Sequence, residues 1–301
     1  MITSTGINEV QLSRWATAPS ETEETKCQNA VQRIKDAIEN RFNSQVSVFL
    51  QGSYKNRTNV RKDSDVDIVA RHNDIYFPDI TGLSEEDKIT YNKLHTDAIY
   101  TFSQFKTDVQ SALESVFLAG EVERKDKCLR VKENSYRVNA DVVPCFTHKR
   151  FRTPYQVEAE GIEFLADSYA RIHSFPEQHF ENGKNKNVQT KQMYKSIVRI
   201  FKSIRGELID RGEITKDLTS SFFIECLVWN VPDQGFNEST FYQATRNVIV
   251  QIYNDMKTEE KYSQYAEVSD LKWLFPKNST KRTPQQAQQF MQLAYNFIGY
   301  K

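Results

Sequence analysis

A pair of aspartates spaced one residue apart, following a Gly-Ser pair, constrains this chain more than any other feature. Asp65 stands twelve residues after Ser53, and Asp67 follows after one apolar residue. The alternating apolar residues here predict a strand over 64–70, with both carboxylates on one face. Two adjacent hard oxygen ligands can share divalent metal ions, and two such ions roughly 3.5–4 Å apart clamp the attacking and leaving oxygens of phosphoryl transfer. The pattern therefore predicts metal-dependent phosphoryl chemistry.

The Gly-Ser pair and a third carboxylate extend this pattern. An alternating strand over 45–51 runs directly into Gly52 and Ser53. Glycine lets backbone amides approach a phosphate, and the serine hydroxyl adds a donor. Asp141 lies in an apolar-flanked strand over 135–143, where a charge has no packing role, so we expect it to face a metal ion or another cation. An isolated Asp-x-Asp is usually a solvated loop or strand end, but this combination favours a functional site.

Three segments, GSYKNRT, DSDVDIV and VNADVVP, together resemble the polymerase-beta-like palm of the nucleotidyltransferase superfamily. More narrowly, the chain resembles the CD-NTases, the bacterial relatives of cyclic GMP-AMP synthase and oligoadenylate synthase. Residues 191–208 and 220–232 look like the paired helices that follow the palm in that family. The resemblance covers most of residues 45–232. It implies an α+β fold, in which a palm with a mixed sheet and flanking helices is followed by a helical domain.

The resemblance also implies roles for the palm side chains. Asp65, Asp67 and Asp141 would be the catalytic residues and would hold two Mg²⁺ or Mn²⁺ ions. Gly52 and Ser53 would bind the phosphates of the nucleotide.

Three further nucleotide contacts follow from comparing the helical segment with the animal synthase. Lys202 would bind the triphosphate, Ser221 would bind a phosphate, and Phe222 would replace a base-stacking tyrosine. Phenylalanine keeps the π-face but lacks the hydroxyl, so it tolerates different bases. Lys202 shares a helix face with Lys195 and Arg199. That spacing fits either a solvated basic face or a phosphate-binding face.

Composition limits the partners that we expect. The chain has 40 basic and 40 acidic residues, whereas proteins that grip a nucleic-acid backbone usually carry excess positive charge. Cys145 and His148 have no second such pair, so the zinc insert of the animal synthase is absent. We therefore expect that long nucleic acid is not required. No signal-like segment or apolar run near 18 residues occurs, so we expect no membrane partner and a cytoplasmic location.

The periodicity predicts two domains that meet near residue 165. Residues 1–165 would form the catalytic domain with an N-terminal helix, and residues 166–301 a helical domain that completes the nucleotide pocket. Further strands are expected over 121–132, with extended pieces at 151–157 and 161–165. Helices are expected over 21–42, from Ser84 to Phe117, and over 189–210, 218–230, 238–257 and 284–298.

The function that these implications favour is a metal-dependent nucleotidyltransferase. It would make a cyclic di- or oligonucleotide second messenger from ribonucleoside triphosphates in bacterial anti-phage (CBASS) signalling. Its partners would be a downstream effector that binds the product, and CBASS accessory proteins. One alternative is a template-independent terminal nucleotidyltransferase acting on RNA or protein. Another is a non-catalytic nucleotide-binding module, although the presence of all three aspartates argues against it.

Overall fold

The computed structural model describes residues 7–18, 21–60, 65–277 and 281–300. Its contacts group the chain into two compact units. The palm unit contains Ser20–Lys55 and Ser64–Pro176, and the helical unit contains Met1–Pro19, Asn56–Asp63 and Glu177–Lys301. The chain therefore enters the helical unit three times.

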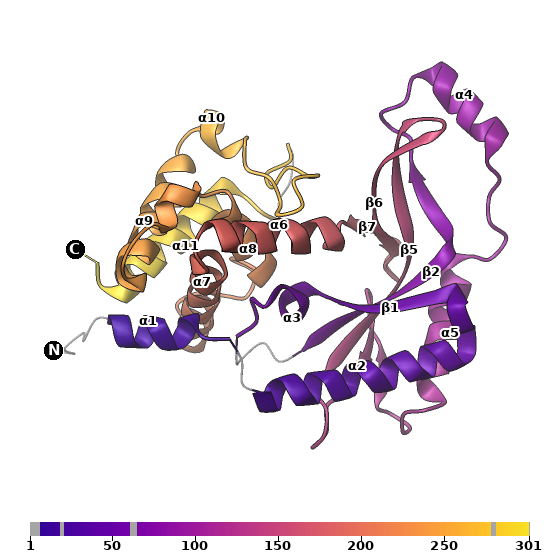
Figure 1. Ribbon diagram of the computed structural model, residues 1–301, viewed down its shortest axis with the longest axis horizontal. Helices are drawn as coiled ribbons and strands as arrows, with labels where there is room; N and C mark the ends of the chain where they lie inside the picture. Colours follow the sequence, from indigo (N-terminus) through magenta and orange to yellow (C-terminus); the bar gives the residue numbers. More distant parts are fainter. Residues whose placement is uncertain (1–6, 19–20, 61–64, 278–280, 301) are drawn as a thin grey trace. The chain divides into compact units, whose positions relative to one another are not determined.

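The palm unit is built on a mixed sheet, drawn in Figure 1. Among the described residues it has seven strands, in the order β1-β2-β5-β4-β3, with β6 paired to β5 and β7 to β6. β2 and β5 are parallel, and the other neighbours are antiparallel. The strands are β1 (Val46–Gln51), β2 (Val66–Asp79), β3 (Val122–Arg124), β4 (Leu129–Val131), β5 (Ala140–Thr153), β6 (Gln156–Leu165) and β7 (Arg171–Ser174).

The division of the chain differs from the predicted boundary near residue 165. β6 ends at Leu165, but β7 pairs with it through Ile162 to Leu165, so the sheet continues to Ser174. Of the predicted strand over 64–70, residue 64 lies outside the described residues, and β2 begins at Val66.

Two helices cover the sheet and share its core. They are α2 (Glu21–Phe42), which confirms the helix predicted over 21–42, and α5 (Phe102–Glu114). The buried core joins apolar residues of both helices to those of β2 and β5. Ala30, Ile34 and Ile38 of α2 lie at helical spacing and are fully buried, because that stripe faces the sheet. The mixed sheet and its helices confirm the predicted α+β fold.

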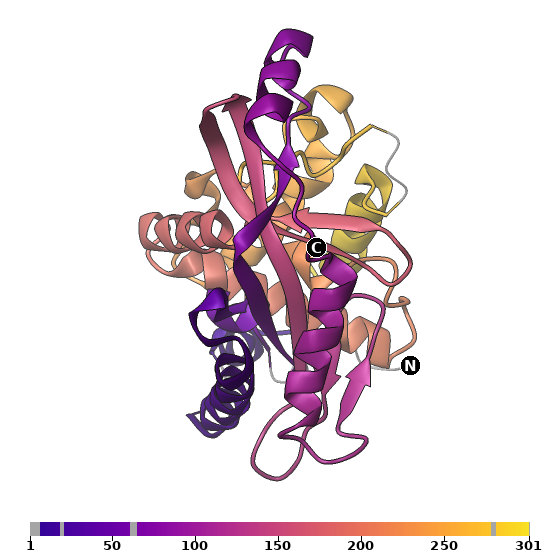
Figure 2. The same cartoon turned by 90° about the vertical axis from the view of Figure 1, so that its right-hand side faces the viewer.

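The single helix predicted from Ser84 to Phe117 is wrong, because the structure has two helices there. α4 (Glu85–Leu94) begins at a Ser84 cap, and α5 begins at a capping box formed by Thr101 and Gln104. Figure 2 shows α4 at the far end of the long strands, away from α5. The apolar period continues through the intervening residues, but Ile99 within them is almost fully exposed. The capping box at Thr101 therefore starts a new helix, although the apolar spacing is that of one continuous helix.

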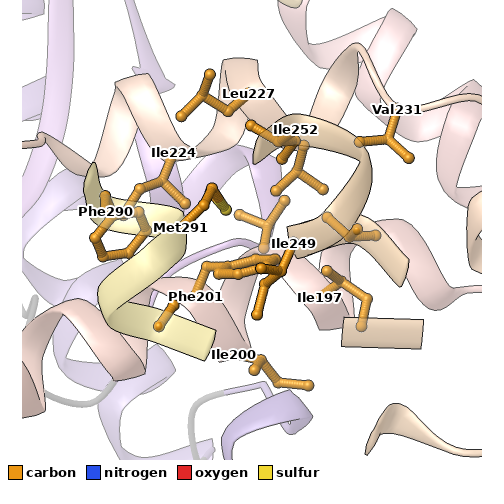
Figure 3. Packing of buried hydrophobic residues seen from close by; sticks show 14 of the residues in the cluster. Ile197, Ile200, Phe201, Ile224, Leu227, Val231, Ile249, Ile252, Phe290 and Met291 are labelled. Atoms are coloured by element: carbon orange, nitrogen blue, oxygen red, sulfur yellow. The ribbon is translucent and has the colours of Figure 1, made fainter. Parts of the chain in front are cut away.

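The helical unit packs around one apolar core. Figure 3 shows α7, α8, α9 and α11 contributing side chains to it, including Phe201, Ile224, Ile249 and Phe290. The helices predicted over 189–210, 218–230 and 238–257 are confirmed with shorter bounds, and the helix predicted over 284–298 is confirmed with the same bounds. The four predicted helices are α7 (Met193–Asp210), α8 (Ser221–Trp229), α9 (Phe241–Asp255) and α11 (Pro284–Ile298). Two further helices, α1 (Glu9–Ala16) and α6 (Pro176–Gln189), were not predicted. The remaining helices, α3 (Gly52–Asn56) and α10 (Glu259–Tyr262), are short.

Within the described part of the chain, every helix is too short or too polar to cross a membrane.

Candidate active site

Three aspartates meet where two neighbouring palm strands begin. Asp65 directly precedes β2, Asp67 is the second residue of β2, and Asp141 is the second residue of β5. Because the two strands are parallel, their register places Asp67 opposite Asp141. Side chains alternate along a strand, so Asp65 and Asp67 project on one face. Strand pairing thus brings together the three carboxylates that the sequence singles out.

The Gly-Ser pair lies beside the same carboxylates. β1 is antiparallel to β2, and Gln51 at its end is opposite Asp67. Gly52 and Ser53 follow at once and begin the short helix α3. Gly52 has a φ of +67°, and a Cβ built on it would lie 2.2 Å from Asp67 Oδ2. Only glycine fits this position, because both its backbone conformation and the close carboxylate exclude a side chain.

Arg130 of β4, which the sequence analysis did not single out, joins two of the carboxylates. Its Nη2 donates to Asp65 Oδ2 at 2.8 Å and to Asp141 Oδ2 at 2.9 Å, and its Nε donates to Asp141 Oδ1 at 2.8 Å. These bonds with Asp141 raise the pKa of Arg130 above its ordinary value despite partial burial. Arg130 interrupts the apolar strand Leu129–Val131, which was a usable sequence signal.

The thiol of Cys128 lies near the same group. Burial, followed by the charge of Asp141, raises the pKa of Cys128 to about 12. The thiol is therefore protonated at neutral pH.

The three carboxylates fit a divalent metal ion in their chemistry. They are hard oxygen donors, and one nitrogen atom of Arg130 already contacts both Asp65 and Asp141, so a single cation can reach both. Across the described ranges, however, no three acidic, histidine or cysteine side chains already enclose a common metal position. To bind an ion, the oxygens of Asp65 and Asp141 would have to leave Arg130 or be shared with it.

Lys202 of the helical unit is buried in a network of charges. Its Nζ lies 3.0 Å from Thr58 Oγ1 and 3.1 Å from Glu225 Oε2. His179 Nε2 lies 2.9 Å from the other oxygen of Glu225, and the Asn56 amide is close to the same oxygen. Only 3% of Lys202 and 4% of Glu225 is exposed, so the interpretation of a solvated basic face is wrong at this residue.

The charge of Glu225 is maintained by its partners. Burial by itself would raise the pKa of Glu225, but the positive charges of Lys202 and His179 outweigh burial and hold that pKa well below its ordinary value. Glu225 was not predicted as a functional residue, although it is a lone acid in the apolar run of α8. Like Asp141, it is a charge within an apolar segment, and that pattern is a usable sequence signal.

Arg199 of the same helix is also buried rather than solvated. Its Nε donates to the Ala16 carbonyl and its Nη1 to the Arg57 carbonyl, both at 2.6 Å. Arg199 therefore joins α1 and residue 57 to α7 within the helical unit.

Ser221 and Phe222 begin helix α8. Ser220 caps this helix, so Ser221 lies at the positive end of the helix dipole. Phe222 is 40% exposed, and the guanidinium of Arg282 lies 5.4 Å from its ring centroid. Arg282 covers one part of the ring, and an exposed part of an aromatic ring can stack on a planar ligand.

Comparison with known proteins adds to this geometry. Residues 181–299 match the model of the cGAS/DncV-like nucleotidyltransferase C-terminal helical domain. The chain is 50% identical to a cyclic dipurine nucleotide synthase of Elizabethkingia meningoseptica, over 98% of this chain and 99% of that protein. It is 36% identical to a cyclic dipyrimidine nucleotide synthase, CdnE, of Cecembia lonarensis, over 97% of this chain and 98% of that protein.

Solved structures give the same result. The chain is similar to the E. meningoseptica CdnE cyclic dinucleotide synthase solved with GTP and Apcpp, with a TM-score of 0.82, 47% identity, and coverage of 98% of this chain and 100% of that one. It is also similar to the Rhodothermus marinus CdnE c-UMP-AMP synthase solved with Apcpp and Upnpp. That TM-score is 0.83, with 31% identity and coverage of 98% and 97%.

Replacing Gly52 by alanine should lower the free energy of unfolding by about 1–3 kcal/mol or more, because the backbone is left-handed there and Asp67 is in the way. Gly82→Ala is the matched control. Its Cβ would meet no atom within 4 Å, so a change below about 1 kcal/mol is expected. Denaturant unfolding measures both. In an Asp67→Ala background the cost of Gly52→Ala should shrink to the backbone strain. Equal costs at 52 and 82 would contradict the packing of Gly52 on Asp67.

Replacing Glu225 by glutamine should lower the free energy of unfolding by about 3–5 kcal/mol at pH 7, because Lys202 is left buried without a counter-charge. Glu85→Gln, which breaks the exposed pair with Lys88, should cost at most about 1 kcal/mol.

The cost at Glu225 should depend on pH. Its pKa is lower in the folded chain than the ordinary 4.5, so its stabilisation is complete above that pH and is lost as the pH falls through the lowered value. The difference between wild type and Glu225→Gln should therefore shrink in acid. A constant difference across this range would show that the charge of Glu225 does not stabilise the fold.

Proposed function

This chain belongs to the CD-NTase family of cyclic nucleotide synthases, and we propose that it joins two purine ribonucleoside triphosphates into a cyclic dinucleotide. One arrangement carries the proposal: Asp67 faces Asp141 across parallel strands, with Asp65 on the same face and Gly52 packed on Asp67. Such a face gathers negative oxygens where a reaction on phosphate needs bound cations.

The palm residues would divide the work of binding. Asp65, Asp67 and Asp141 would hold two Mg²⁺ or Mn²⁺ ions. When bound, such ions lower the pKa of an attacking hydroxyl and neutralise charge on the phosphates. The backbone amides at Gly52 and the hydroxyl of Ser53 would bind the phosphates and orient the α phosphate toward the aspartates. The chain would then need no catalytic histidine.

Three residues of the helical unit are proposed to contact the nucleotide. Ser221 would donate to a phosphate at the start of α8, where the helix dipole favours an anion. Phe222 would stack on a base through its exposed ring. Lys202 would offer the triphosphate its remaining N–H, since two are directed to Thr58 and Glu225. Its charge is partly offset by Glu225, so its contribution to nucleotide affinity would be smaller than that of an unpaired lysine.

The proposed preference for purines rests on a comparison of sequence identities to two relatives. The relative called a dipurine synthase is 50% identical to this chain, whereas the relative called a dipyrimidine synthase is 36% identical. These two relatives share the family, but their names differ in the bases of the product. Residues other than Asp65, Asp67 and Asp141, which form the carboxylate face, must therefore set the choice of base. The greater identity to the dipurine synthase favours purines.

The product would act as a second messenger in CBASS anti-phage signalling. It would bind a downstream effector, and CBASS accessory proteins would control the synthase. The support is family membership.

Replacing both Asp65 and Asp67 by asparagine should reduce product formation by at least about a thousand-fold, because the anionic metal ligands are lost while side-chain size is kept. Asp74→Asn is the matched control, since Asp74 is exposed on the same strand, and its activity should stay within about two-fold. Product is quantified by mass spectrometry, and circular dichroism checks the fold. Full activity of the double variant would end the nucleotidyltransferase proposal.

Purified, nuclease-treated protein should convert ATP and GTP, with Mg²⁺ or Mn²⁺, into a product that resists phosphatase, because ring closure leaves no terminal phosphomonoester. CTP and UTP should be poor substrates. Added double-stranded DNA or RNA should change the rate by less than about three-fold, consistent with zero net charge. Phosphatase treatment followed by mass spectrometry measures both. Strict dependence on nucleic acid, or labelling of an RNA or protein acceptor without a small product, would contradict the proposal.

A further inference from the structure

Arg130 occupies the position from which a cation can reach the carboxylate face. It lies on β4 in register with Asp141 on β5, and its guanidinium reaches past that residue to Asp65, which directly precedes β2. Its bonds to Asp141 use both carboxylate oxygens, and Nη2 is shared with Asp65. One side chain thus ties together the beginnings of β2 and β5.

The ion pair lies where solvent and ligands can reach it. The side chains of Arg130, Asp65 and Asp141 are 32%, 42% and 21% exposed, unlike the buried pair of Lys202 and Glu225. A half-exposed pair can exchange partners, whereas breaking a buried pair leaves an uncompensated charge. The geometry therefore permits Arg130 to leave the carboxylates without unfolding the sheet.

We propose that Arg130 is a positioning residue that holds the carboxylate face together when no divalent ion is bound and competes with that ion for Asp65 and Asp141. The choice of a divalent ion as competitor rests on the proposed function. Without a counter-charge, Asp65 and Asp141 would repel each other and move apart. With Arg130 in place they stay converged, but an arriving ion must displace three charge-assisted hydrogen bonds. Arg130 therefore preserves the shape of the site and weakens its affinity for the bare ion.

A second arginine of the sheet provides a matched control. Arg124 on β3 makes a two-bond ion pair with Asp167, with both distances 2.9 Å, and its side chain is 33% exposed. This pair has an exposure similar to that of Arg130, but its acid is Asp167, which also pairs with Lys106, and it does not involve Asp65 or Asp141. Replacing Arg124 removes a comparable ion pair and should leave ion affinity unchanged.

The experiment measures Mn²⁺ binding to the full chain, without nucleotide, by electron paramagnetic resonance of the free ion. Arg130→Gln should lower the Mn²⁺ dissociation constant by about ten-fold or more, because the ion no longer has to displace one to two charge-assisted hydrogen bonds. Arg130→Lys, which keeps the charge but loses the fork, should tighten it by a few-fold. Arg124→Gln should stay within about two-fold of wild type.

Melting temperatures give an independent readout. In EDTA, Arg130→Gln should melt below wild type, because the carboxylates lose their counter-charge. Saturating Mn²⁺ should raise its melting temperature more than that of wild type. If Arg130→Gln does not fold at the assay temperature, the Arg130→Lys variant tests the same competition.

The outcomes separate this inference from the proposed function. An unchanged or weakened Mn²⁺ affinity in both Arg130 variants, with wild type binding Mn²⁺ through Asp65 and Asp67, would overturn the competition and leave the metal site intact. Mn²⁺ binding that is absent from wild type and from every variant would overturn both the metal site and the competition. Binding that survives in Asp65→Asn/Asp67→Asn would have the same consequence, because the ion would then lie elsewhere.

Discussion

The parallel pairing of β2 with β5 is the interaction on which the candidate site depends. It joins two strands that are far apart in the sequence, and its register places Asp67 opposite Asp141. A slip of one residue would turn one of these carboxylates to the other face of the sheet. Parallel strands need a long connection, and here the connection contains α4, α5, β3 and β4. That same connection supplies Arg130 on the strand next to β5, so one topological requirement provides both the anionic face and its counter-charge.

The network around Glu225 and the ion pairs of Arg130 perform different physical tasks. Glu225 is enclosed with Lys202 and His179, and each partner would carry a large desolvation cost without the others. Such a network gives the helical unit one specific packing of α6, α7 and α8. The aspartates of the palm are half-exposed, and Arg130 compensates only part of their charge. An accessible ion pair that can exchange partners is typical of a binding site, whereas a charge network enclosed in a dry interior is typical of a core.

Local patterns predicted the elements of the site better than they predicted its partners. Alternation and apolar flanks placed Asp67 and Asp141 in strands, where a charge has few structural explanations. The strand predicted over 135–143 has the wrong bounds, however, because β5 begins at Ala140 and runs on to Thr153. The helix from Ser84 to Phe117 was predicted wrongly, because the apolar period continues across a break that the Thr101 cap imposes. The contact of Arg130 with Asp141 depends on which strand lies beside β5, and short segments of sequence carry no information on strand order. The burial of Lys202 likewise depends on residues 56–60, which sequence separation conceals.

The threefold entry of the chain into the helical unit has a consequence for biosynthesis. Arg199 of α7 donates to the carbonyls of Ala16 and Arg57, and Lys202 donates to the Thr58 hydroxyl. The hydrogen-bond acceptors of these two α7 side chains are therefore synthesised much earlier than α7 itself. During translation the N-terminal helix α1 leaves the ribosome long before α7, α9 and α11 exist. The palm sheet, by contrast, is complete once residue 174 has been made. The palm can therefore fold during synthesis, whereas α1 can pack into the helical unit only after the later helices of that unit have been made.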